Sequence, residues 1–268
     1  MMKLRFQFFL VFLSAVLLLS LTGCNSDRKR LENFVTLLNK QCPYPVDDFG
    51  RCVGVTLVDD TIVYNCQATD SNTKKSLEKL TGQRHNLVKV AELGLLLNQD
   101  QKSLDKLLAW GVDVKYDVRD GLSKPIFAFT LRNDSLKNLQ QRYANRDEMR
   151  LELLTLQTEL SNVKLPIRVD AYTLFTHQEI TATDLVYTYT VDERQMGLPL
   201  SMLKAETASM RGSIAKKWAT TPELSKQARL LAKLNRGVVY HYQGNPSGDV
   251  FELRFTPRET ATKLAGGK

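Results

Sequence analysis

The sequence predicts an α+β protein built as an internal duplication, with two units of the order α-β-β-α-α-β-β. Two 30-residue stretches align without a gap at an offset of 123, and the segments after them also align. Helical and strand periodicities follow one another in the same order in both copies. We place the repeats at residues 24–133 and 134–268, behind a leader at 1–23. Each repeat is expected to form an antiparallel sheet of about four strands with helices packed on one face.

The first aligned stretch, Gln41 to Asp70, matches Lys164 to Glu193. Its matched blocks are Pro43 with Pro166, Val46-Asp47 with Val169-Asp170, and Ile62-Val63-Tyr64 with Leu185-Val186-Tyr187. The second stretch aligns at an offset of 126, pairing Leu104 with Leu230, Leu108 with Leu234, Gly111 with Gly237, Tyr116 with Tyr242, and Phe129-Thr130 with Phe255-Thr256. Several ordered blocks with so small a drift indicate duplication and not chance.

Each unit begins with a helix, because leucines recur at three-and-four spacing over residues 28–40 and again over 146–162. Both helices end shortly before a proline. Two short segments rich in Val, Thr and Tyr follow in each copy. They are split by Asp59-Asp60 in the first copy and by residues 182–184 in the second, which predicts a β-hairpin in each.

The middle of each unit reads as two helices, at residues 76–98 and 101–110 in the first copy and at 200–219 and 221–236 in the second. Gly111 and Gly237 are expected to end the second helix in a left-handed conformation. Thr221 and Pro222 form a favourable helix start. A second hairpin closes each unit, over 112–131 and 238–256, and the tail at 261–268 is expected to be disordered.

The first residues predict an export signal. From Phe8 to Leu21 the chain is almost continuously apolar, behind Lys3 and Arg5. About 14 apolar residues are too few to span a bilayer, which needs roughly 20, but they suit the apolar region of a signal peptide.

The end of that run, Leu21-Thr22-Gly23-Cys24, resembles the lipobox of bacterial lipoproteins. The resemblance implies that the Cys24 thiol receives a diacylglycerol, that the leader is cut before it, and that the new N-terminus is acylated. It further implies a lipid anchor in the cell envelope of a Gram-negative bacterium. Asn25, in place of an aspartate, favours the outer membrane in enterobacteria. With two or more acyl chains, such an anchor holds without a spanning helix.

Charge adds little about partners. Removing the leader lowers the net charge from +8 to +6, and the basic residues are spread along the chain. We expect no nucleic-acid partner, since an exported protein meets little of it. The run Arg28-Lys29-Arg30 follows the anchor, where it either favours an anionic membrane surface or begins a solvated helix.

Three further cysteines, Cys42, Cys52 and Cys66, all lie in the first copy, opposite Leu165, Phe175 and Tyr189 of the second. A disulfide is the default in an oxidising compartment, and an odd number leaves one thiol over. We favour Cys52 with Cys66, which flank the first hairpin, with Cys42 and Cys66 as the alternative. The favoured pair needs a bulge or a three-residue turn, because a strict two-residue turn would set Val53 opposite Cys66. No Cys-x-x-Cys spacing indicates a redox motif.

The sequence offers no catalytic, metal or cofactor site. His85, His177 and His241 are scattered, without helical metal-ligand spacing, and the common hydrolase and nucleotide-binding motifs are absent. Asp47 and Asp170 recur at matched places in the two copies. The same is true of two tyrosine pairs, Tyr64 with Tyr187 and Tyr116 with Tyr242. We interpret the aspartates as caps of the turn into a strand and the tyrosines as sheet residues.

Three hypotheses of function remain open. The first is a non-catalytic protein-interaction module of the envelope, bound to membrane lipid through Cys24 and to another envelope protein. The second is an enzyme or small-ligand carrier with a cleft between the repeats, lined by Asp47, Asp170, His177 and His241. The third is an inhibitor or immunity-type protein that blocks an envelope hydrolase. The aligned segments also resemble single-unit exported bacterial proteins to which no activity is assigned.

Overall fold

The computed structural model describes residues 27–46, 50–68, 71–98, 101–143 and 145–266. The chain divides into two compact units, and the division falls between Leu153 and Leu154. The predicted leader at 1–23 and the lipid-bearing Cys24 lie outside the described residues, and the predicted repeat boundaries stay a prediction. None of the helices in the described ranges has the length and apolar character needed to cross a bilayer.

The first unit contains five strands and five α-helices in the described ranges. Its strands are β1 (Tyr44–Val46), β2 (Gly50–Val58), β3 (Thr61–Gln67), β4 (Asp113–Arg119) and β5 (Pro125–Leu131). Its helices are α1 (Asp27–Lys40), α2 (Ser71–Leu80), α3 (Arg84–Asn98), α4 (Gln101–Trp110) and α5 (Asn133–Arg142), with the 3-10 turn η2 (Thr81–Gln83) between α2 and α3. The predicted first helix and both predicted hairpins of this unit are confirmed, whereas β1 and α5 were not predicted.

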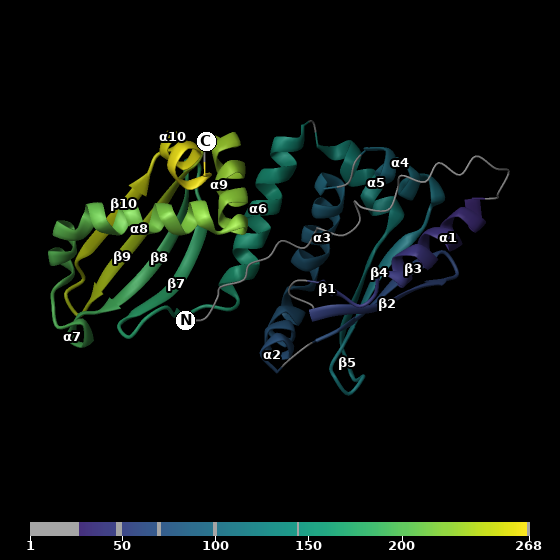
Figure 1. Cartoon of the computed structure of the whole chain (residues 1–268), viewed down its shortest axis with the longest axis horizontal. Coiled ribbons are helices and arrows are strands. Elements are labelled where there is room, and N and C mark those ends of the chain that lie inside the picture. The colour runs from purple at the N-terminus through teal and green to yellow at the C-terminus, as the bar shows by residue number, and fades with distance from the viewer. Residues whose placement is uncertain (1–26, 47–49, 69–70, 99–100, 144, 267–268) are drawn as a thin grey trace. The chain divides into compact units, whose positions relative to one another are not determined.

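The second unit repeats this order after helix α6 (Arg146–Asn162), which the division between the units crosses. Its strands are β6 (Ile167–Arg168), β7 (Thr173–Ile180), β8 (Asp184–Asp192), β9 (Gly237–Asn245) and β10 (Val250–Phe255). Its further helical elements are α7 (Glu193–Met196), η3 (Leu200–Glu206), α8 (Thr207–Thr220), α9 (Pro222–Lys233), α10 (Pro257–Glu259) and η4 (Thr260–Leu264). In Figure 1, α8 lies across strands β7 to β10, which run side by side.

The predicted α+β class is confirmed, but the sheets are not antiparallel throughout. Each has five strands, in the order β1-β2-β3-β4-β5 and β10-β9-β8-β7-β6. The central pairs β3·β4 and β8·β9 are parallel, and all the others are antiparallel. The reason lies in the connection. A helical crossover between the central strands brings the chain back to the end of the sheet where the first strand began, so the second strand runs in the same direction.

A β-bulge and an asparagine recur at matched positions in the two sheets. The β2·β3 register shifts between Cys52 and Gly54, and the β7·β8 register shifts between Phe175 and His177. Just beyond each bulge, an asparagine from the first helix accepts a strand N–H: Asn39 from Val55 and Asn162 from Gln178, both at 2.9 Å. Asn162 also donates to the Gln178 carbonyl at 2.7 Å. The short edge strands β1 and β6 do not extend as far as Val55 and Gln178. The asparagine side chain therefore accepts a backbone N–H that would otherwise be unpaired at the edge of the sheet.

The last strand pair corrects the sequence alignment. Tyr64 lies opposite Tyr116 and Tyr187 lies opposite Tyr240, so Tyr116 corresponds to Tyr240 and not to Tyr242. The true offset here is 124. Because the predicted offset of 126 is wrong by two residues, one full strand period, it still assigned each side chain to the correct face of the sheet.

The helix stop of the second copy moves with this shift. Gly111 has φ 69°, as expected of a left-handed stop, but Asn235 with φ 52° takes that position in the second unit. Asparagine tolerates this conformation better than most residues with a Cβ. Gly237 instead lies inside β9, where a Cβ would be 2.4 Å from both the Phe255 carbonyl oxygen and the Asp184 carboxylate. Close approach of neighbouring atoms therefore accounts for Gly237.

The prediction of a disordered tail is wrong for residues 261–266. The Leu264 side chain is fully buried in the core of the second unit. The Ala265 carbonyl accepts hydrogen bonds from Ser225 at 2.8 Å and Arg229 at 3.1 Å on α9. A capping box of Thr256 and Glu259 starts this last helical segment, which the small and polar residues of the tail concealed.

We predict opposite effects from alanine at two glycines of the second unit. Gly237→Ala should lower the free energy of unfolding by about 1–3 kcal/mol, because its Cβ would overlap backbone and carboxylate atoms. Gly212→Ala, on α8 with open space around it, should raise it by about 0.5–1 kcal/mol through helix propensity. Urea unfolding of both variants measures this. Equal destabilisation by the two substitutions would contradict the close approach inferred at Gly237.

Candidate functional site

Each sheet buries one face under helices of its own unit and leaves the other accessible. Along β3, Ile62, Tyr64 and Cys66 are buried, while the alternate residues are half-exposed. Along β10, Phe251, Leu253 and Phe255 are buried, while the alternate residues are exposed. We call the accessible side the open face. In the second sheet it carries His177, Glu179, Val186, Thr188, Thr190, His241, Gln243, Val250, Glu252 and Arg254.

The register brings two of the scattered histidines into one row across this open face. His177 on β7 pairs with Thr188 on β8, Thr188 pairs with His241 on β9, and His241 pairs with Glu252 on β10. His241 Nδ1 lies 2.8 Å from Glu252 Oε1. Since neighbouring strands are about 4.8 Å apart, the two histidines are separated by about 10 Å along the row. His85, on α3, is not part of it.

The row offers recognition more readily than catalysis. Glu252 orients the His241 ring, as in hydrolytic sites. Among the described residues, however, the His241 ring is hydrogen-bonded to Glu252 and not to a hydroxyl group that could act as a nucleophile. The face is also open to water, which weakens electrostatic stabilisation of a transition state. Within the described ranges, no group of three or more His, Cys, Asp or Glu side chains is arranged to hold a metal ion.

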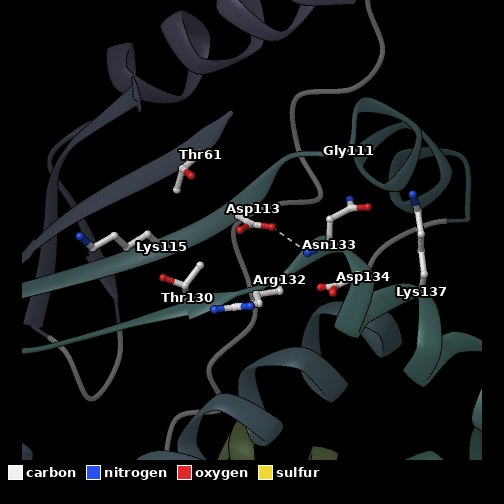
Figure 2. A pocket seen from close by; sticks show the side chains of 9 residues that line it. All are labelled: Thr61, Gly111, Asp113, Lys115, Thr130, Arg132, Asn133, Asp134 and Lys137. Atoms are coloured by element: carbon white, nitrogen blue, oxygen red, sulfur yellow. Dashed lines mark hydrogen bonds between the residues drawn. The ribbon is translucent and has the colours of Figure 1, made fainter. Parts of the chain in front are cut away.

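A shallow depression in the first unit is the second candidate (Figure 2). It is an open hollow of about 690 Å³ near the start of β4 and the start of α5. Figure 2 shows Lys115, Thr130 and Arg132 on one side of Asp113 and Lys137 on the other. The lining residues are Thr61, Gly111, Asp113, Lys115, Thr130, Arg132, Asn133, Asp134 and Lys137.

The central groups of the depression have structural partners. The Asp113 carboxylate accepts the Asn133 backbone N–H at 2.9 Å, which caps the first turn of α5 from a neighbouring strand. The buried Asn133 amide donates to the Leu107 and Val112 carbonyls at 3.3 and 3.4 Å. These bonds join the end of α4 to the start of α5. The polar groups at the centre of the depression therefore hold α5 in place. The depression itself is open to solvent and does not enclose a ligand.

The three cysteines of the first unit meet at one end of its sheet. Cys52 and Cys66 lie directly opposite each other on β2 and β3, and Cys42 Sγ lies 3.8 Å from Cys52 Sγ. All three are free thiols in this structure, so the favoured Cys52–Cys66 disulfide and the alternative Cys42–Cys66 stay predictions. The bulge that the favoured pair needs is confirmed: a two-residue turn joins β2 to β3, and Val53 is the extra residue.

Hydrogen bonding distinguishes the three thiols. The pKa of the Cys52 thiol lies below its ordinary range. The largest cause is a hydrogen bond with the Cys66 thiol, and a hydrogen bond with the Tyr44 hydroxyl adds to it, whereas burial acts in the opposite direction. Burial raises the pKa of the Cys42 thiol. The hydrogen bond to Cys52, followed by burial, raises the pKa of the Cys66 thiol. The pKa of Cys52 is thus shifted in the opposite direction from those of its two neighbours.

The other predicted residues take structural positions. The Asp170 carboxylate accepts the N–H groups of Tyr172 and Thr173 at 3.0 and 2.8 Å, which confirms its capping of a turn. Asp47 lies outside the described residues. The tyrosines lie on the buried faces, where Tyr64 stacks on Tyr116 at 5.1 Å and Tyr189 stacks on Tyr242 at 5.0 Å. Of the four residues suggested to line a ligand cleft, His177 and His241 share a face.

Comparison with known proteins gives little further guidance. No protein family matches the chain, and no curated protein matches it. Among solved structures, a crystal structure of a "putative secreted protein" from Pseudomonas aeruginosa matches with 13% sequence identity and a TM-score of 0.35. The match covers 44% of this chain and 98% of that chain. It assigns no activity here.

Proposed function

We propose that this chain is a lipid-anchored lipoprotein of the cell envelope that binds another envelope protein without catalysing a reaction. The anchor is the acylated Cys24, at the outer membrane of a Gram-negative bacterium. The binding surfaces are the open faces of the two sheets. The observation that carries the proposal is that each unit covers one side of its sheet with helices and leaves the other side accessible.

The composition of the open faces suits a protein partner. On the second sheet, Val250 is 50% exposed beside exposed Glu252 and Arg254, so apolar and charged groups alternate over a broad, shallow surface. Protein interfaces have this mixture, whereas small-molecule sites are concave and enclose their ligand. The depression near α5 is open, and its central groups already have partners.

The two faces are similar in shape and different in chemistry. Where the second sheet carries the row of His177, Thr188, His241 and Glu252, the matched row of the first sheet is Gly54, Asn65, Asp117 and Ala128. The duplication thus supplies two distinct surfaces on one chain, and two weak contacts with one partner would reinforce each other through effective concentration.

Loss of the acylation site should release the protein from the membrane. Cys24→Ser removes the thiol that would carry the diacylglycerol, and with it the apolar chains that hold the protein at about 0.8 kcal/mol per buried methylene. Labelling with a radioactive fatty acid and membrane fractionation measure this. We expect labelling and membrane recovery to be lost in Cys24→Ser and kept in a Cys42→Ser control. Unchanged labelling of Cys24→Ser would contradict the anchor.

Site-specific photo-crosslinking tests the binding surface. A photoreactive amino acid at His177 or Gln243, both exposed on the open face, should give one discrete crosslinked species in intact cells. The matched control is Lys216, which is also exposed but lies on α8, on the covered side of the sheet. We expect the crosslink from the open-face positions and not from Lys216.

A crosslink equally strong from all three positions would indicate nonspecific proximity. Its absence from the open-face positions, with the protein present in the membrane, would contradict the proposal.

A further inference from the structure

The three thiols of the first unit form a line in which Cys52 is shared. Cys42, between α1 and β1, is half-buried and lies 3.8 Å from Cys52, measured between the sulfur atoms. Cys52 is fully buried on β2, and Cys66, 2% exposed, faces it from β3. Cys52 is hydrogen-bonded to both of the other thiols. Of the three thiols, Cys42 is therefore the one most accessible to solvent.

Packing does not require thiols at these places, as the second unit shows. There Leu165 stands for Cys42, and the Phe175 and Tyr189 rings, 5.1 Å apart, stand for Cys52 and Cys66. The same bulge aligns both pairs. One leucine and an aromatic pair thus stand in one unit at the positions that hold three neighbouring thiols in the other, so the fold does not depend on cysteine at these positions.

We propose that Cys42, Cys52 and Cys66 form a thiol–disulfide relay that passes a disulfide bond from an external disulfide compound to the buried Cys52–Cys66 pair. Cys42 attacks the external disulfide R–S–S–R, which forms Cys42–S–S–R and releases one RSH. Cys52 then attacks Cys42 Sγ, which forms the Cys42–Cys52 disulfide and releases a second RSH. The two thiol protons leave on the two RSH molecules, and the oxidant is reduced by two electrons.

The last step moves the bond inward without further oxidation. Cys66 attacks Cys52 Sγ, so that the Cys52–Cys66 disulfide forms and Cys42 leaves as a thiolate that takes up the proton Cys66 has lost. Cys52 is the central member because its sulfur atom lies 3.8 Å from that of Cys42 and its residue pairs directly with Cys66 across the two strands. The reverse sequence would deliver the bond outward to an external dithiol.

Peptide mapping of a timed oxidation tests the relay. The full chain carrying Cys24→Ser, in which three thiols remain, is reduced, exposed to glutathione disulfide, quenched with acid, alkylated and digested with trypsin. Cleavage after Lys40, Arg51 and Lys74 places Cys42 on peptide 41–51 and both other cysteines on peptide 52–74. We expect glutathione on Cys42 first, then a link between the two peptides, and finally a disulfide within peptide 52–74 with Cys42 free.

Single substitutions stop the relay at different stages. In Cys52→Ser, glutathione should persist on Cys42 and the internal disulfide should be lost. In Cys66→Ser, oxidation should end at the Cys42–Cys52 link. In Cys42→Ser, formation of the disulfide within peptide 52–74 should be lost over the same period. Thermal unfolding checks that each variant is folded, and if Cys52→Ser is not, the other two variants still decide the question.

Three results would overturn the relay. They are undiminished formation of the Cys52–Cys66 disulfide in Cys42→Ser, release of glutathione from Cys42 in Cys66→Ser without a link between the peptides, and no reaction of the parent chain. The first would leave the buried pair as an ordinary structural disulfide.

Discussion

Parallel pairing of the two central strands is the constraint on which each unit depends. Strands β3 and β4, like β8 and β9, run in the same direction, and the chain between them must travel back along the sheet. It does so as helices, α2 to α4 in the first unit and α7 to α9 in the second. These helices, with α1 or α6, cover one face, where the aromatic residues gather. Within the described ranges, no element of the same unit covers the other face, and the proposed binding surface follows from that asymmetry.

A second constraint fixes what each face carries. The bulge after Cys52, matched after Phe175, adds one residue to the second strand of each sheet and moves the following side chains to the opposite face. Asn39 and Asn162 hold the strand just beyond the bulge. The bulge sets Cys52 opposite Cys66 in the first unit and places His177 on the open face of the second. The same irregularity, present once in each sheet, thus positions the Cys52 thiol in the first unit and the His177 side chain in the second.

The sequence contained most of the fold. The repeat, the first helix of each unit, both hairpins and the need for a bulge or a three-residue turn near the cysteines followed from periodicity and spacing. The parallel central pair did not, because strand direction depends on where the helical crossover ends. The shift from offset 126 to 124 was hidden because a matching glycine favoured the wrong alignment, although Asn235 takes the left-handed position. The ordered tail was missed because Leu264 finds its buried site only when α9 is in place.

The candidate sites were less accessible to sequence reasoning. His177 and His241 are 64 residues apart and become neighbours only through the register of three strand pairs. A search for alternating polar residues on matched strands would have suggested a shared face, but not the row. The approach of Cys42 to Cys52 depends on how the chain turns from α1 into the edge of the sheet. No spacing rule supplies that distance.

Histidine footprinting in the native envelope tests the central claim most directly. Diethyl pyrocarbonate modifies accessible imidazoles, and the chain has three histidines, of which His177 and His241 share the open face and exposed His85 lies on α3. Modification is compared between the purified full chain and the same chain in intact cells. The account predicts that His177 and His241 are protected in cells relative to His85. Equal relative reactivity of the three histidines in both preparations would contradict it.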